Sequence, residues 1–281
     1  MASTAPWTCP TCKVGVATPF CPACGERTLH PRELTLRWLL EHAFEAFTSV
    51  DSKLLRSFRH LVFRPGQLTA AFLQGRRQPF MGPVPLFLIT NVLFFAAEAL
   101  LGGTVFNTPL DWHLHRQPWS GFAPQLVANR LAGMHTTLAL YAPVFDKAVA
   151  VNARSLIIFM ALFFALFPML VFMRRKQPLI THAVFSLHLY SFMLLLFCVA
   201  TMVPVFSARM GGPGFDSDAL DHLLAISLLL ICAAYLFFAI PEVYQVRGIA
   251  RGTSALLLTI AVGASALGYR FFLLIVTLYT T

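Results

Sequence analysis

One apolar stretch divides this chain into a polar front and an apolar remainder. Residues 83–101 read PVPLFLITNVLFFAAEALL, and only Thr90, Asn91 and Glu98 interrupt their apolar character. A helix of this length covers the roughly 30 Å of hydrocarbon in a lipid bilayer. The pattern therefore predicts a first transmembrane helix from Pro83 to Leu101.

The rest of the chain has the composition of a membrane protein. Hydrophobic residues make up 57% of the sequence and charged residues only 12%, and the mean hydropathy is +0.70, far from the values of a soluble domain. Four more apolar segments follow the first, and each suits one crossing. We expect an all-α polytopic membrane domain over residues 83–281, with its later spans at about 155–173, 183–206, 223–241 and 254–278.

Basic residues indicate how these spans are oriented. They gather before the first span, between the second and third, and between the fourth and fifth, which all lie on one side: Arg76, Arg77, Arg174, Arg175, Lys176, Arg247 and Arg251. Lys and Arg concentrate in cytoplasmic loops, so the N-terminus is predicted in the cytoplasm and the C-terminus on the outer side. The first eighty residues have no apolar segment after a basic start, so we expect no cleaved signal sequence.

The formal net charge of +9 raises the question of the partner. The Lys and Arg residues lie beside apolar segments, where they suit anionic lipid headgroups at the cytoplasmic face. We therefore expect the lipid bilayer with its anionic headgroups as one partner and a protein that binds the zinc ribbon as a candidate second partner, and we do not expect nucleic acid.

Four of the six cysteines lie near the N-terminus. They form two CxxC pairs separated by eight residues: Cys9, Cys12, Cys21 and Cys24. Each pair lets two thiolates converge on one ion, and two pairs complete a tetrahedral sulfur site. Gly25, directly after the last cysteine, adopts positive φ without steric cost. The spacing predicts a zinc ribbon over residues 1–28 that holds a structural zinc ion.

Two other states of these cysteines stay open: disulfides, and an iron site of the rubredoxin kind. Disulfides rarely persist in a reducing cytoplasm, and bound metal would supply much of the folding free energy of so small a unit. Four thiolates leave no open coordination position. We therefore expect a structural or docking role for the metal, and not zinc-activated hydrolysis.

Residues 29–82 carry two amphipathic helical stripes that are too short and too polar to span. One stripe contains Leu36, Leu39, Leu40, Ala43, Phe44 and Phe47, and the other contains Leu54, Leu55, Phe58, Leu61 and Val62. Arg56, Arg59 and His60 interleave with the second stripe, which fits helices in the lipid headgroup region. The same stripes also fit helices packed under the membrane domain.

This front segment resembles an uncharacterised bacterial family. The resemblance rests on Asp51-Ser-Lys53, Arg64-Pro65-Gly66 and Gly75-Arg76-Arg77, placed behind a CxxC pair that is followed by glycine, and it covers residues 9–95. The family consists of zinc-ribbon-headed, multi-pass inner-membrane proteins with a domain of unknown function. The resemblance implies a bacterial inner membrane and no known activity. Ser57 departs from the threonine that the signature leads us to expect.

A second metal site is a candidate in the external segment after the first span. In Asp111-Trp-His113-Leu-His115, three potential ligands alternate, and on an extended strand they face the same way. The alternative is that they are hydrated loop residues near the aromatic membrane interface.

Ionisable residues within the spans form a candidate intramembrane polar site. Glu98 and Arg270 both fall in the outer half of the bilayer, where they could neutralise each other. Histidines of the third span and a glutamate of the fourth lie near the cytoplasmic face: His182, His188 and Glu242. These residues could form a proton or anion pathway, or only a structural ion pair and interhelical hydrogen bonds.

No common enzyme signature is present, since GxSxG, HExxH, GxxxxGK[ST] and a strand-linked GxGxxG are all missing. The sequence favours a non-enzyme. The leading hypothesis is a membrane protein of unknown activity whose zinc ribbon acts as a docking or regulatory head in a scaffold role. The alternative is a small transporter or lipid-handling protein that uses its intramembrane polar residues.

Overall fold

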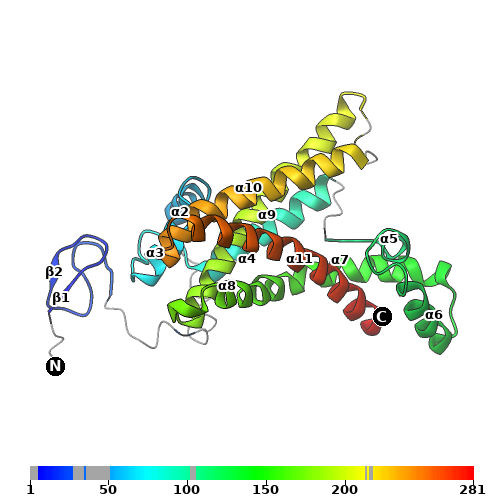
Figure 1. Cartoon of the computed structure of the whole chain (residues 1–281), viewed down its shortest axis with the longest axis horizontal. Coiled ribbons are helices and arrows are strands. Elements are labelled where there is room, and N and C mark those ends of the chain that lie inside the picture. Colours follow the sequence, from blue (N-terminus) through cyan, green and yellow to red (C-terminus); the bar gives the residue numbers. More distant parts are fainter. Residues whose placement is uncertain (1–5, 28–34, 36–50, 102–105, 213, 215–217) are drawn as a thin grey trace.

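The computed structural model describes residues 6–27, 35, 51–101, 106–212, 214 and 218–281. A small two-stranded unit at the N-terminus is followed by a bundle of helices (Figure 1). The first predicted amphipathic stripe, Leu36 to Phe47, lies outside the described residues.

Five helices in the described part of the chain are long and apolar enough to cross a membrane. They are α4 (Pro83–Leu101), α7 (Leu138–Phe164) with its continuation α8 (Leu166–Val171), α9 (Leu179–Arg209), α10 (Asp218–Tyr244) and α11 (Ile249–Thr280). A helix pairs its own backbone N–H and C=O groups, as a lipid environment requires. The predicted number of spans is thus confirmed by helices of suitable length and composition.

The helix that carries the second candidate span begins at Leu138, well before the predicted span start at about residue 155. Charged Asp146 lies in the first half of α7 and makes that half look like an external loop in the sequence. In the structure its Oδ1 accepts the backbone N–H of Leu110 at 2.8 Å. Asp146 therefore caps the short helix α5 (Leu110–His115).

A proline divides the second span into α7 and α8. Pro168 has no N–H to donate to the carbonyl of Phe164, and its ring crowds that carbonyl. Accordingly, α7 ends at Phe164 and α8 resumes after Ala165. The 3-10 turn η3 (Met173–Arg175) and Lys176, at φ 47°, then reverse the chain into α9.

The bundle has an aromatic core and an apolar outer surface. α4 packs along α9, and α11 lies between α7 and α10. Phe106 packs edge-on against Phe94, Phe197 and Tyr269, with ring centroids 5.7–5.8 Å apart. Large apolar side chains remain exposed on the outside of the spans, where lipid would cover them: Val92, Leu100, Phe163, Leu230 and Leu256.

Two short helices connect the N-terminal unit to the bundle. α2 (Asp51–Phe63) and α3 (Gln67–Leu73) meet at Gly66, whose φ of +83° turns the chain sharply. α3 buries Leu68, Thr69 and Phe72 against α9 and α10. In the second stripe, on α2, Leu61 is buried with Leu54 and Phe58 packed beside it, whereas Leu55 and Val62 are exposed.

The N-terminal unit and the C-terminus lie at opposite ends of the molecule. Figure 1 shows α2 and α3 on the side of the N-terminal unit, while α5 and α6 (Ala123–Met134) lie with the end of α11 at the other side. An odd number of crossings produces this arrangement.

Candidate metal centre

The four N-terminal cysteines sit on two tight turns with the same geometry. In each turn the N–H of the first cysteine donates to the carbonyl five residues later, at 2.9 and 2.6 Å, and the N–H four residues later donates back, at 2.9 and 2.8 Å. Strand β1 (Trp7–Thr8) pairs with β2 (Gly15–Val16) around the first turn, and a bridge joins Phe20 to Arg27 around the second. We refer to residues 6–27 as the head.

The residue after each second cysteine takes a left-handed backbone conformation. The φ angles are 64° for Lys13 and 72° for Gly25. Glycine adopts this conformation freely, whereas lysine does so at a cost of about 1 kcal/mol. The turn itself thus demands positive φ at both positions, although the sequence indicates it only at Gly25.

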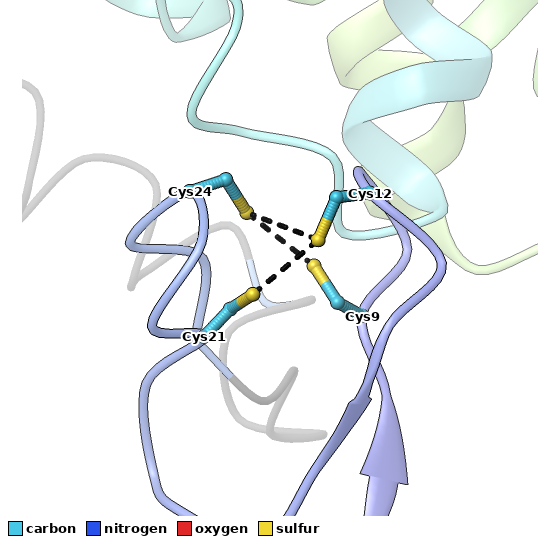
Figure 2. Close-up of side chains that lie close together, drawn as sticks. All are labelled: Cys9, Cys12, Cys21 and Cys24. Carbon is cyan, nitrogen blue, oxygen red and sulfur yellow. Dashed lines mark hydrogen bonds between the residues drawn. The ribbon is translucent and has the colours of Figure 1, made fainter.

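The four sulfur atoms converge, as Figure 2 shows. All lie within 4.8 Å of one another, and the hydrogen-bonded pairs are 3.5 Å apart for Cys9 and Cys24, 3.4 Å for Cys12 and Cys21, and 3.8 Å for Cys12 and Cys24. Four sulfurs each about 2.3 Å from one ion form a tetrahedron with edges of about 3.8 Å. The thiols are therefore placed as metal ligands would be.

Disulfides do not form among these cysteines. All four are free thiols, and their separations greatly exceed a disulfide bond length of about 2.05 Å. Four soft sulfur donors suit zinc or iron rather than magnesium or calcium. The four cysteines could hold a metal ion, and a set of four leaves no position for a reacting water molecule.

Crowding makes the thiols share their protons unequally. At Cys24 a hydrogen bond from the backbone of Glu26 lowers the pKa, but burial and the three other thiols outweigh it and raise the pKa to about 12. At Cys21 burial raises the pKa, but hydrogen bonds from Cys12 and from the backbone of Ala23 and Cys24 outweigh it and lower the pKa to about 7. Binding a metal as four thiolates would therefore release protons.

One carboxylate joins the head to the membrane domain. Glu26 is 2% exposed, and its Oε2 accepts three hydrogen bonds: from Thr11 Oγ1 at 2.8 Å, from the backbone N–H of Arg77 at 3.0 Å and from that of Gln78 at 3.1 Å. The Gln78 side chain donates in return to the carbonyl of Gly25 at 3.1 Å. We call this set of contacts the Glu26 clamp.

The clamp escaped the sequence interpretation. Glu26 is the one acidic residue among the first 28, and it follows the last cysteine by two positions. The available signal for this contact was a lone carboxylate in a small head. The chain later ends a helix with Gly75-Arg76-Arg77, where the clamp is made. Its partners are backbone N–H groups 51 and 52 positions away, which no side-chain pattern reveals.

The proposed external metal site is not assembled. Leu110–His115 forms helix α5 and not the predicted extended strand, because Asp146 caps its first turn. Asp111 and His115 lie one turn apart on an exposed face, 3.0 Å from each other, while His113 points inward. In the described part of the chain only the four cysteines gather three or more potential ligands.

His113 instead belongs to a buried cluster at this end of the bundle. It is fully buried, stacks on Trp119 with ring centroids 5.7 Å apart, and accepts the Trp119 indole N–H at 3.3 Å. Burial, and then the charge of nearby Arg270, lower the pKa of His113 to about 4. The imidazole is therefore neutral at pH 7 and adds no second cation beside Arg270.

Glu98 is buried and forms hydrogen bonds with residues that follow α4 in the chain. It is 1% exposed and accepts hydrogen bonds from the backbone N–H of Phe106 at 3.4 Å and from Asn107 Nδ2 at 3.2 Å. Arg270 lies within electrostatic range of Glu98. The two opposite charges do approach each other between α4 and α11, and Glu98 also fixes the chain that follows α4. A proton or anion pathway through them stays a prediction.

The polar residues predicted at the cytoplasmic face divide into two separate contacts. His182 Nδ1 lies 3.0 Å from the Tyr244 hydroxyl, and His188 Nδ1 lies 2.9 Å from Thr69 Oγ1 on α3. Both histidines are buried, whereas Glu242 is exposed at the end of α10. Thr69, which the sequence interpretation missed, ties the front segment to the third span.

A known family model matches part of the chain. The model of a family described as "Protein of unknown function (DUF3667)" matches residues 51–95, which cover α2, α3, the turn of the Glu26 clamp and the first part of α4. This supports the predicted resemblance to a family of unknown function over these residues. No curated protein and no solved structure matches the chain.

Proposed function

We propose that the four cysteines hold a structural zinc ion and that the zinc-loaded head is a docking or regulatory module on a five-helix membrane domain. The observation that carries the proposal is the convergence of four free thiols within 4.8 Å, on a head that the Glu26 clamp fixes to the membrane domain. Zinc is preferred over iron because it is the common occupant of paired CxxC turns.

The small apolar core of the head supports a structural role for the metal. Its buried apolar residues are Cys9, Val16 and Cys21, with Trp7 packed against them. So few apolar contacts cannot offset the conformational entropy lost on folding more than twenty residues. Metal binding would supply the missing free energy and would also bring Glu26, two positions after Cys24, to its place in the clamp.

The position of the clamp supports a docking role. Glu26 contacts the turn that leads directly into the first span, so folding of the head is coupled to the entrance of the membrane domain. A partner that competes for the head, or loss of the metal, would release this turn. Binding of a metal or a partner to the head would thereby change the conformation at the entrance of the spans.

We place this protein in a bacterial inner membrane with the head in the cytoplasm. The basic residues at 76–77, 174–176, 247 and 251 all border ends of spans on the side of the head. A reporter that functions only in the cytoplasm should be inactive when it is fused to the C-terminus. Activity of that fusion would contradict this orientation.

Glu26→Ala is expected to detach the head from the membrane domain. The substitution removes the acceptor of the Gln78 N–H and leaves the Arg77 N–H with the Gly75 carbonyl alone, at a cost of about 1–3 kcal/mol. Hydrogen exchange of the peptide that contains these two residues, measured by mass spectrometry on the zinc-loaded protein, should accelerate by about tenfold or more.

Two variants control this experiment. Thr11→Ala removes one donor to the same carboxylate oxygen but leaves both backbone contacts in place, and Glu26→Gln keeps an oxygen acceptor. Both should retain most of the protection. Equal exchange in Glu26→Ala and the wild type would mean that the clamp does not hold the head, and the docking proposal would fail.

A further inference from the structure

One face of α2 fixes this helix at the entrance of the first span. Ser57 is fully buried, donates its hydroxyl to the Lys53 carbonyl at 2.7 Å and accepts the backbone N–H of Met81 at 2.9 Å. Met81 lies two residues before Pro83, where α4 begins. α2 therefore lies at the depth where the first span enters the bilayer, which is the layer of lipid headgroups.

The opposite face of α2 combines large apolar side chains with arginines. Leu55 and Phe63 are 74% and 77% exposed, and Arg56 and Arg59 are exposed between them. A helix with apolar and basic residues on one open face suits the boundary between headgroups and acyl chains, since each side chain finds a favourable environment there.

A hollow of about 420 Å³ opens at the end of this face. Arg59, His60, Phe63 and Arg64 line it. Two contacts hold His60 in place. Its Nδ1 donates a hydrogen bond to the Arg56 carbonyl at 3.0 Å, and its ring packs edge-on against Phe80, with 4.8 Å between the ring centroids. The N–H of Arg64 donates to the His60 carbonyl at 2.9 Å. These contacts fix the positions of the side chains that line the hollow.

Arg59 and Arg64 carry their guanidinium groups at the hollow, and no carboxylate of the described residues forms an ion pair with either of them. An arginine side chain binds a phosphate through two parallel N–H···O contacts. Two arginines around one hollow provide the charge that a phosphate group requires.

We propose that this hollow binds the phosphate of an anionic phospholipid headgroup, held by Arg59 and Arg64, while Phe63 inserts beside the acyl chains. The headgroup is preferred over a soluble phosphate compound because the hollow lies at the headgroup layer and its wall includes an exposed aromatic side chain. The site is independent of the metal, and the proposal does not rest on the docking role of the head.

Native mass spectrometry of the full-length, zinc-loaded protein tests this site. The protein is released from mixed micelles that contain phosphatidylglycerol and phosphatidylcholine, and the retained lipids are counted. The wild type should keep one phosphatidylglycerol in preference to phosphatidylcholine. In Arg59→Gln/Arg64→Gln this preference should fall by about tenfold, as expected for the loss of charge-assisted contacts.

Arg56→Gln provides the matched control, because Arg56 is exposed on the same helix but does not line the hollow. Its lipid preference should stay within about twofold of the wild type. Equal losses in this control and in the double variant would overturn a specific site, and so would no loss in the double variant. Displacement of the lipid by inorganic phosphate at equal concentration would overturn the headgroup assignment. The thermal midpoints of all variants should agree, because the changed side chains are exposed.

Discussion

Cys21→Ser/Cys24→Ser should unfold the head while the spans remain folded. Two of the four ligands are lost, and zinc binding of this kind contributes about 10–16 kcal/mol in small zinc-dependent units. Few other contacts can replace it, because the buried apolar residues of the head are mainly the cysteines themselves. Limited digestion with trypsin at Lys13 and Arg27 should become faster by on the order of a hundredfold.

Cys198→Ser is the control for this experiment, since Cys198 lies in α9, far from the head along the chain, and is only half-buried. Its digestion pattern should match that of the wild type. Removal of zinc from the wild type by a chelator should reproduce the pattern of the double variant. An unchanged digestion rate in the double variant would show that the head folds without its metal.

Gly66→Ala should destabilise the contact between the front helices and the membrane domain. A Cβ atom at this position would lie 2.6 Å from the Ala239 carbonyl oxygen and 2.9 Å from Cβ of Glu242, and these atoms belong to the rigid helix α10. The φ of +83° adds strain for any side chain. The two effects together should cost about 3 kcal/mol or more, which lowers the thermal midpoint in micelles by about 6–10 °C.

Gly211→Ala separates these two effects. Gly211 has nearly the same φ, +80°, but a Cβ there would meet no atom within 4 Å. It should incur the backbone strain alone, about 1 kcal/mol, and lower the midpoint by about 3 °C. Equal shifts in the two variants would mean that α3 and α10 do not approach as closely as described.

The spans could be predicted because the bilayer imposes one simple rule. A stretch that crosses lipid must be apolar over about twenty residues. This can be recognised in residues 83–101 alone, without reference to the rest of the chain. The start of α7 could not be found in the same way. Asp146 breaks the apolar pattern of α7. Its carboxylate is stabilised by a hydrogen bond from the backbone N–H of Leu110, 36 positions away in the sequence.

The convergence of the four cysteines was predictable for a similar reason. Two CxxC pairs at close spacing can meet through local turns alone, so the geometry is encoded in a few neighbouring residues. The alternation of Asp111, His113 and His115, taken by itself, predicts a strand. The helix that they actually form depends on its cap from α7, which is a tertiary contact.

The contacts that join the parts of the molecule had no sequence signature. Glu26 uses backbone N–H groups of Arg77 and Gln78, and Thr69 reaches His188 across 119 positions. Any residue except proline can donate its backbone N–H, so in the Glu26 contacts the partner's side chain gives no indication. Such contacts determine how the head and front helices are attached, and only the structure reveals them.

The most direct test of the metal centre is the metal content of the full-length protein purified under reducing conditions. Elemental analysis should find one zinc ion per chain in the wild type and none in Cys21→Ser/Cys24→Ser of equal purity. Iron in place of zinc would retain the site but contradict its assignment to zinc. The absence of any stoichiometric metal from the wild type would contradict the metal centre itself, and with it the proposal that a metal-folded head is docked on the membrane domain.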